Sequence, residues 1–246
     1  GYLSGQRCKM DGEDTVGYMY TFPIPEELRL GNAFMMGVKK TCPECKMIVT
    51  PINSWHDPVV EQEAAKALFD AGAYIVFTGA DTPAPAIVAE SYKEGKGKWG
   101  IPYDWKGSCT SKRCLTLPYW NWGPVYASIV EGLRDGTYTP GRHYFDGDEN
   151  GLGLYGFMEG EELTDGLKDM PEEVLTFVRN YIADIEAGKW TRFDLFSGPI
   201  IDNQGNVVVP EGEKMEDADL DTFDCSTTGC KYGMHYWNEG IIAELP

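Results

Sequence analysis

The sequence predicts an α/β protein built on a parallel sheet with helices on its faces. Three observations carry this prediction. Short runs of β-branched and aromatic residues alternate with longer amphipathic runs through residues 15–104. Each amphipathic run is long enough to form the crossover helix that joins two parallel strands. The strand-like run 73–78 is apolar on both faces, which is typical of a parallel strand covered by helices.

Within residues 15–104 we expect a β-α-β-α-β-α-β series. The first strand, 15–21, alternates β-branched and aromatic residues and ends before Pro23. The helix that follows has Glu26 and Glu27 in its first turn, where negative charge interacts favourably with the helix dipole. The remaining predicted elements are a strand at 46–52, a helix at 59–71, a strand at 73–78, a helix at 82–91 and a strand at 99–103.

The chain beyond residue 104 is less regular. A loop closed by cysteines is expected at 105–117, a helix at 122–134 and a short strand at 152–157. Residues 171–187 form a clean amphipathic pattern with apolar residues at helical spacing, and Gly188 ends it. Residues 199–210 carry a turn sequence between two apolar runs and predict a hairpin. We interpret the acidic cluster that follows as a solvated helix start, with Glu216, Asp217, Asp219 and Asp221.

Composition excludes several classes of function. The 246 residues are 42% hydrophobic and 24% charged, as in a folded globular protein. The formal net charge of −18 disfavours binding to nucleic acid or to anionic lipid, both of which attract basic surfaces. No apolar run approaches the ~20 residues that a membrane-spanning helix needs. We therefore expect no nucleic-acid partner and no insertion into a membrane.

Six of the seven cysteines fall into close pairs, which predicts disulfides that close short loops in an oxidising compartment. The pairs are Cys42/Cys45, Cys109/Cys114 and Cys225/Cys230. Cys8 is left over, either free or bonded outside this chain. The first pair also resembles half of a zinc ribbon, but zinc needs a second pair of similar spacing or a pair of histidines, and neither is evident. We expect disulfides and no metal site. A redox role for the first pair is disfavoured because it precedes a strand.

Aromatic and acidic residues stand where the predicted strands end. Small molecules bind outside the carboxyl ends of the strands in an open α/β sheet. Trp55, Asp81 and Asp104 hold such positions, and three aromatic rings surround one amide at 119–124. A ring beside carboxylates suits a flat ligand that stacks and donates hydrogen bonds, so this edge is the candidate site.

Each candidate also has a purely structural interpretation. A tryptophan at position 55 could belong to the core, and at least one ring of 119–124 is expected there. Asp57 is a helix N-cap first, because Pro58 and a helical pattern follow it. Asp81 could cap the following segment, whereas Asp104 is followed by loop and is the better candidate for ligand contact.

Catalytic and calcium-binding motifs receive little support. The residues from Asp146 to Asn150 begin like an EF-hand loop, but Phe157 occupies the twelfth position, where calcium needs a bidentate glutamate. We interpret that stretch as an acidic turn. His56 could act as a general base beside Asp57, but no nucleophile, catalytic triad or phosphate-binding loop accompanies it. We expect neither an enzyme nor a cofactor.

A series of motifs, in order along the chain, resembles the basic membrane protein (BMP) family. The motifs lie at 17–26, 53–58, 70–73, 103–104, 120–124, 196–200 and 209–213. Members of this family are type I periplasmic binding proteins that deliver solutes to ABC transporters, and the pattern is most similar to the purine- and nucleoside-binding branch. The resemblance implies a secreted protein, periplasmic or extracellular, with an ABC permease as partner.

The resemblance also implies a division of the chain into parts of a two-lobed protein, with the first lobe largely missing. Residues 1–14 would be the tail of the first lobe and 15–104 the core of the second. Residues 105–150 would return to the first lobe. Residues 151–246 would complete the second lobe and carry a C-terminal hairpin and helix. The three cysteine pairs depart from the usual family pattern.

The implied function is non-catalytic binding of a purine base or nucleoside in the cleft between two lobes. Trp55 or Trp120 would stack on the base, and Asp81 and Asp104 would accept hydrogen bonds from its amine. Phe22 and Asn53 would line the cleft, with Trp122 beside them. One alternative is a secreted structural or sensory module that kept the fold within a larger extracellular assembly. A more distant one is an enzyme that acts on nucleosides.

Overall fold

A computed structural model describes residues 1–141, 143–145, 147–226 and 228–243. Its centre is a five-stranded sheet in the order β4-β3-β1-β2-β9, in which every neighbouring pair is parallel. The strands are β1 (Thr15–Tyr20), β2 (Lys46–Pro51), β3 (Ile75–Thr78), β4 (Trp99–Ile101) and β9 (Ile241–Ile242). The strand β1 lies in the middle, because it pairs with β2 on one side and β3 on the other.

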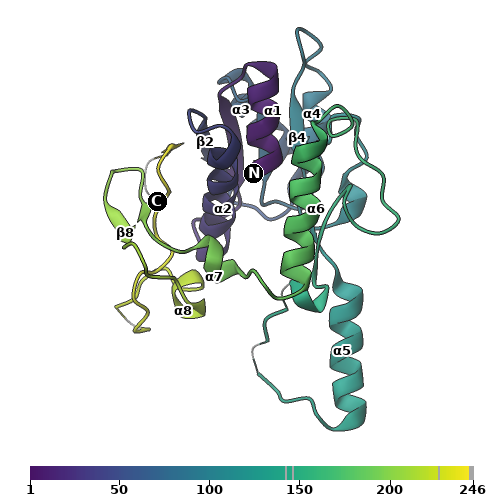
Figure 1. The fold of residues 1–246 in the computed structure, drawn as a ribbon. Coiled ribbons are helices and arrows are strands. Elements are labelled where there is room, and N and C mark those ends of the chain that lie inside the picture. The colour runs from purple at the N-terminus through teal and green to yellow at the C-terminus, as the bar shows by residue number, and fades with distance from the viewer. Residues whose placement is uncertain (142, 146, 227, 244–246) are drawn as a thin grey trace.

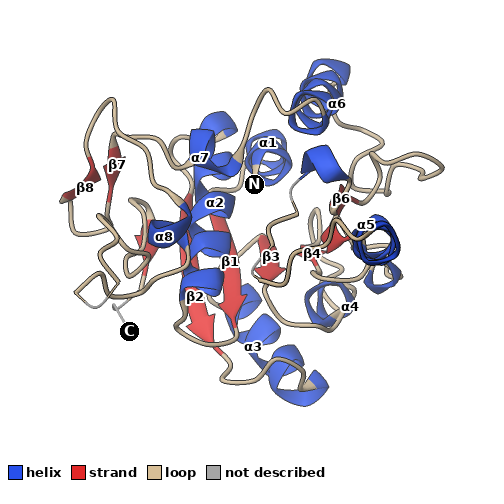
Figure 2. Cartoon of the chain, turned by 90° about the horizontal axis from the view of Figure 1, so that it is seen from below, coloured by secondary structure: helices blue, strands red, loops and turns tan. Residues whose placement is uncertain are grey.

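Helices cover both faces of the sheet, which gives three layers (Figures 1 and 2). On one face lie α1 (Tyr2–Asp11), α2 (Pro25–Thr41) and α6 (Glu172–Glu186), and on the other lie α3 (Pro58–Asp70) and α4 (Ala84–Ala89). The side chains of β1 alternate between the two layers. Tyr18 joins the larger core with α2, whereas Met19 joins the smaller core with α3 and α4. The alternation follows from the period of two of a β-strand.

The remaining elements form smaller units. The strands β5 (Pro118–Trp120) and β6 (Leu152–Leu154) pair antiparallel, as do β7 (Ile200–Ile201) and β8 (Val207–Val209). Among the described residues the other helices are α5 (Trp122–Asp135), α7 (Arg192–Leu195), α8 (Asp217–Leu220) and the 3₁₀ turns η1 (Lys106–Ser108) and η2 (Gly147–Glu149). No helix in the described part of the chain is both long and apolar enough to span a bilayer.

The predicted alternation of strands and helices in residues 15–104 is confirmed, with ends that shift by one or two residues. The predicted helices at 122–134 and 171–187, the strand at 152–157 and the hairpin at 199–210 are also present. The three strands of the last two features are shorter than expected. The strands β5 and β9 were not predicted from the sequence. The acidic turn proposed from Asp146 onward cannot be assessed, because Asp146 lies outside the described residues.

The interpretation of the acidic cluster as solvated is wrong for Asp219. A helix does begin there, but the Asp219 side chain is buried. Its carboxylate accepts hydrogen bonds from the backbone N–H groups of Glu216, Lys231 and Tyr232 at 2.7–3.0 Å. These three bonds tie the segment after α8 back onto the helix, and they satisfy a carboxylate that burial would otherwise destabilise.

The three predicted disulfides are confirmed. Cys42–Cys45, Cys109–Cys114 and Cys225–Cys230 are bonded, with Cα–Cα distances of 5.3, 5.5 and 4.8 Å. Each closes a short loop beside a helix or a strand end. The seventh cysteine, Cys8, is a free thiol buried in α1.

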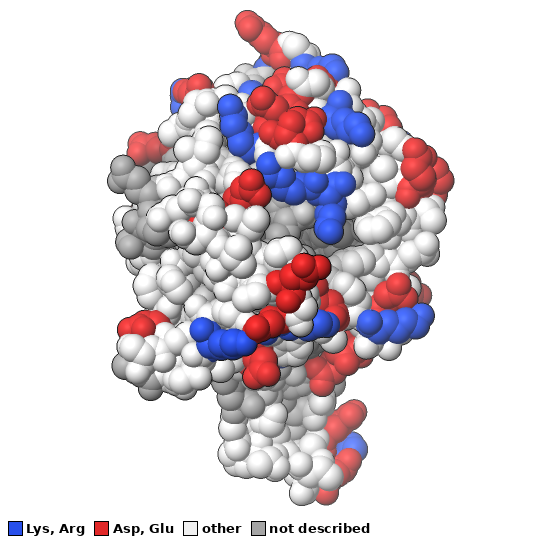
Figure 3. Space-filling view, turned by 60° about the vertical axis from the view of Figure 1, so that its left-hand side comes forward, with Lys and Arg blue, Asp and Glu red and all other residues white. Residues whose placement is uncertain are grey.

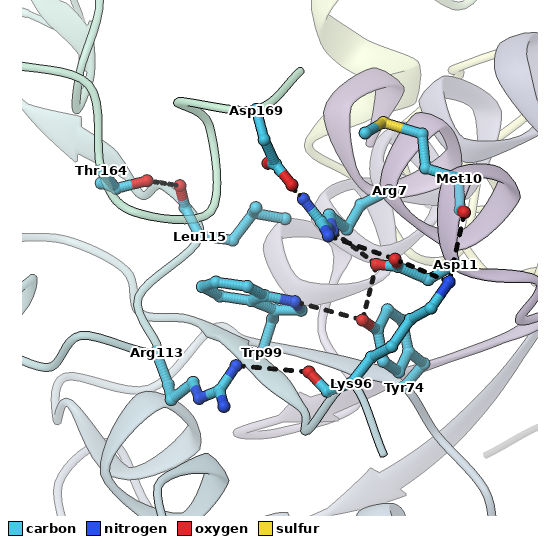
Figure 4. A network of polar contacts seen from close by, with 10 residues as sticks. All are labelled: Arg7, Met10, Asp11, Tyr74, Lys96, Trp99, Arg113, Leu115, Thr164 and Asp169. Atoms are coloured by element: carbon cyan, nitrogen blue, oxygen red, sulfur yellow. Dashed lines mark hydrogen bonds and ion pairs between the residues drawn. The ribbon is translucent and has the colours of Figure 1, made fainter.

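A polar network closes the amino-terminal edge of the sheet (Figure 4). Asp11 at the end of α1 accepts from Arg7 at 2.5 Å and from the hydroxyl of Tyr74 at 2.6 Å, and it pairs with Lys96 at 3.2 Å. The guanidinium of Arg7 also lies 5.4 Å from the ring centre of Trp99. The network fixes α1 against the starts of β3 and β4, at the edge opposite the candidate site.

An arm extends from the body of the molecule. It consists of β5, β6, α5 and the loop after α5, and α5 points away from the sheet (Figure 1). Large apolar side chains of α5 face solvent, with exposed fractions of 49% at Trp122, 60% at Tyr126 and 61% at Leu133. The protruding lower part of the surface carries few charged side chains except near its end (Figure 3). In the described residues no other element packs over this apolar face.

Candidate ligand-binding site

The predicted site residues lie along the carboxyl-terminal edge of the sheet. Phe22 follows β1, Asn53 and Trp55 follow β2, Asp81 follows β3 and Asp104 follows β4. Because these four strands are parallel neighbours, their following loops open on the same edge. Two of these positions have left-handed backbone conformations, with φ of 54° at Asn53 and 73° at Asp104. Non-glycine residues seldom adopt such angles, and those that do concentrate at functional sites.

Phe22, Trp55 and Asp81 form the first of two groups along this edge. The rings of Phe22 and Trp55 are 5.7 Å apart and tilted by 55°, and the Trp55 side chain is 39% exposed. The backbone N–H of Asp81 donates to the carbonyl of Trp55 at 3.0 Å, which links the loop after β3 to the loop after β2. This group presents an open aromatic surface beside a carboxylate.

Asp104, Trp120 and Trp122 form the second group. The N–H of Trp120 donates to the Asp104 carbonyl at 3.0 Å, so that β5 continues the edge beyond β4. The ring of Trp120 is 6.3 Å from Tyr103 and 5.9 Å from Trp122. Trp120 is therefore half-buried between a core ring and the start of α5.

The carboxylates of the two groups influence each other electrostatically. Burial raises the pKa of Asp81, and the nearby charge of Asp104 raises it further, while His56 acts in the opposite direction. Burial also raises the pKa of Asp104. Within the described residues neither side chain has a hydrogen bond or an ion pair, so both are available to accept from a ligand.

The prediction that Asp57 is a helix cap is confirmed. Its Oδ1 accepts from the N–H groups of Val59 and Val60, both at 3.1 Å, at the start of α3. Asn53 shares the loop that this cap fixes and is exposed. The loop conformation that presents Trp55 is thus anchored by the first turn of α3.

The burial of polar groups beneath the edge, among them Glu27 and Tyr103, was not predicted from the sequence. Glu27 is fully buried in the first turn of α2, and the hydroxyl of Tyr103 is buried without a hydrogen-bond partner in the described residues. Glu27 was assigned with Glu26 to the helix dipole alone. The signal that could have identified it is spacing, because it stands seven residues before the buried Phe34 and shares its helix face.

The candidate edge is an open surface. Two open cavities, each of about 600 Å³, lie elsewhere in the described chain, one between α7 and α8 beside Met215 and one beside Ile241 in β9. Neither is lined by a predicted site residue. The disulfide Cys109–Cys114 braces the loop that follows Asp104 and connects β4 to β5.

Relatives match the chain over most of its length. A putative ABC transporter glucose-binding protein of Haloferax volcanii is 31% identical over 179 residues, which is 71% of this chain and 44% of the relative. A purine-binding protein of Brucella abortus is 28% identical over 239 residues, which is 97% of this chain and 61% of the relative. The chain thus spans about half the length of these relatives.

Solved structures support the same fold. An ABC transporter solute-binding protein from Conexibacter woesei superposes with a TM-score of 0.56 at 20% identity, over 80% of this chain and 63% of that one. A transcriptional activator of the comK gene from Bacillus halodurans gives 0.59 at 18% identity, over 78% of this chain and 63% of that one. At this level of identity the likeness concerns the fold alone.

The sequence profile of one family, described as ABC transporter substrate-binding protein PnrA-like, matches residues 1–178. That match includes all four loops of the candidate edge and both tryptophans of the arm. It confirms the resemblance seen in the motifs: the chain belongs to the Bmp family of ABC transporter substrate-binding proteins.

Proposed function

We propose that this chain binds a purine base or nucleoside at the carboxyl-terminal edge of its sheet, as the second lobe of an extracytoplasmic binding protein that serves an ABC permease. The observation that carries the proposal is that an open aromatic pair, Phe22 and Trp55, and two unpaired carboxylates, Asp81 and Asp104, follow neighbouring parallel strands at one edge of the sheet. The name of the Brucella relative, a purine-binding protein, supports the same ligand class.

The chemistry of a purine suits this arrangement. Stacking of a base on an aromatic side chain contributes ~1–3 kcal/mol. An exocyclic amine or a ribose hydroxyl supplies donors for the carboxylates, and a ligand without such donors leaves a desolvated acceptor unpaired at a cost of ~1–3 kcal/mol. Binding of this kind needs no catalytic group.

We further propose that the arm belongs to the opposite lobe of a longer protein. The chain spans about half the length of its relatives. In addition, α5 exposes an apolar face that the described residues do not cover. Residues 105–150 would then be the segment that returns to the first lobe, and closure of the two lobes would bury the ligand. A buried ligand would contact Trp120 and Trp122 from the arm and Trp55 from the sheet.

Binding is tested by thermal shift and calorimetry on the 246-residue chain with adenine, adenosine, guanosine and glucose. We expect a purine to raise the melting temperature and glucose to have no effect. Trp55→Ala should weaken purine binding by about tenfold, since one stacking contact is lost. Asp104→Asn should also weaken purine binding, because the proposed acceptor is changed. Its matched control is Asp70→Asn, which changes an exposed carboxylate on α3 and should leave binding unchanged. A response to glucose and not to purines would reject the purine proposal.

A further inference from the structure

The buried carboxyl group of Glu27 lies beneath the candidate site and is only partly compensated. Glu27 is 0% exposed in the first turn of α2. Its Oε2 accepts from the Thr21 N–H at 2.8 Å and from the Tyr18 hydroxyl at 3.0 Å. Its Oε1 has no hydrogen-bond partner among the described residues, and no cation pairs with the group there. An ionised carboxylate in such a place would lack compensation for its lost hydration.

Glu27 connects the loops that carry the candidate ligand residues. Thr21, which donates to it, directly precedes Phe22. On the other side its carboxyl group packs against Gly79, two residues before Asp81; a Cβ at that position would lie 2.2 Å from Oε2. The close approach of the two groups requires a glycine. One side chain thus holds the loop after β1 and the loop after β3 together.

The groups that face Glu27 make its proton state consequential. The hydroxyl of Tyr18 on β1 donates a hydrogen bond to Glu27. The negative charge of Glu26 on the same helix raises the pKa of Glu27, and Tyr103 after β4 is a neutral neighbour. Arg29, the nearest cation on α2, is engaged with Asp221 at 2.6 Å. Trp237, which packs on Tyr18 from the C-terminal segment, is uncharged. Burial raises the pKa of Glu27 to about 7, against the opposing hydrogen bonds from Thr21 and Tyr18.

We propose that Glu27 is a positioning residue of the ligand site, and that its carboxyl group must hold a proton for the loops bearing Phe22 and Asp81 to keep the ligand-binding arrangement. The neutral group accepts through Oε2 and fits against Gly79 without needing a counter-ion. When it ionises, it draws towards water and displaces Thr21 and Gly79, and with them the two loops. This inference rests on the proposed function, because it assigns a role within that site.

The sign of the pH effect follows from the raised pKa. A carboxyl group that holds its proton more tightly in the folded state stabilises that state at low pH, and the contribution is lost as pH rises towards 7 and beyond. If only the protonated form binds, the competent fraction falls from about nine tenths at pH 6 to about one tenth at pH 8, so affinity falls about tenfold.

The test compares the 246-residue wild type, Glu27→Gln and Glu63→Gln, with adenine as the probe at pH 6 and pH 8. Glu63 lies exposed on α3 and provides the matched control. We expect the wild type and the control to bind adenine about tenfold more weakly at pH 8, and Glu27→Gln, which keeps the neutral shape, to bind equally at both. Without ligand, the melting temperature of the wild type should fall between pH 6 and 8 by more than that of Glu27→Gln.

The outcomes separate the two proposals. Adenine binding that is equal at both pH values in the wild type, or that changes equally in Glu27→Gln, overturns the inference and leaves the proposed function standing. Absence of purine binding at both pH values overturns both. Should Glu27→Gln fail to fold, Gly79→Ala replaces it: the added methyl must displace the carboxyl group, so affinity at pH 6 should fall several-fold, and an unchanged affinity would overturn the inference.

Discussion

The region of residues 15–104 and the arm that ends in α5 share a local pattern but differ in how far that pattern is buried. Both contain amphipathic helices with a well-formed apolar stripe. In α2 that stripe is buried, with Leu28, Met35 and Val38 at 0% exposed. In α5 the corresponding stripe is open, with Tyr126 and Leu133 about 60% exposed. An amphipathic pattern predicts that a helix forms, whereas the partner of its apolar face depends on tertiary structure.

The difference has an energetic consequence. Burial of apolar surface contributes ~25 cal/mol per Å², so each α2 side chain stabilises the sheet and the exposed α5 side chains contribute little to this chain. An apolar helix face of this kind on a folded protein usually marks an interface. Buried side chains of this kind therefore stabilise the chain through the sheet, whereas the apolar face of α5 is available for an interface.

The largest expected effect separates the two regions directly. Leu28→Ala removes a fully buried side chain from the main core and should lower the free energy of unfolding by ~2–5 kcal/mol. Leu133→Ala makes the same chemical change on α5, where the side chain is exposed, and should change it by no more than ~0.5 kcal/mol. Urea denaturation of both variants measures the contrast, and similar losses in the two would show that the arm packs within the chain.

A second prediction concerns the network that holds α1 to the sheet. Asp11→Asn weakens the pairs with Arg7 and Lys96, both at a buried carboxylate, and should destabilise the chain by on the order of 3 kcal/mol. Asp70→Asn breaks an exposed pair with Lys66, which solvent screens, and should change the stability far less than Asp11→Asn.

The stabilising contribution of Asp11 should disappear in acid. Burial raises the pKa of Asp11, but hydrogen bonds from Arg7, Tyr74 and Lys96 outweigh it and hold the pKa below its ordinary value. A lowered pKa contributes stability that is present above the unfolded pKa, near 4, and is lost as pH falls below it. The melting temperatures of the wild type and Asp11→Asn should therefore converge as the pH is lowered from 6 to 3. A difference in melting temperature that stays constant over this pH range would contradict this account of the network.

The smallest expected effect is on the arm itself. The double variant Val130→Lys with Leu133→Lys places two charges on the exposed apolar face of α5 and should leave the melting temperature of this chain within a few degrees of the wild type. Binding of an apolar fluorescent dye should fall, because the patch is interrupted. In a longer protein that covers α5, the same two lysines should be strongly destabilising, and a neutral result there would separate the arm from the opposite lobe.

Much of the candidate site could be predicted from the sequence because it depends on local rules. Strand ends are marked by a change from apolar to polar residues, and parallel strands bring their ends to one edge, so Trp55, Asp81 and Asp104 could be placed together. The helix cap at Asp57 and the three short disulfides involve residues close in sequence. The contacts of Trp120 could not be placed so well, because β5 is short and pairs with β6 across more than thirty residues.

The sequence by itself determined the order of strands and helices, the edge at which the candidate ligand residues gather and the family to which the chain belongs, since each depends on short-range pattern or on motif. Only the tertiary structure decided which charged groups are buried and which apolar faces are not. Glu27 and Asp219 are buried although their residue type alone predicts exposure to solvent, and the apolar face of α5 is exposed although its residue types predict burial. Burial is set by the elements that pack over a residue, and these come from distant parts of the chain, so local pattern alone does not decide it.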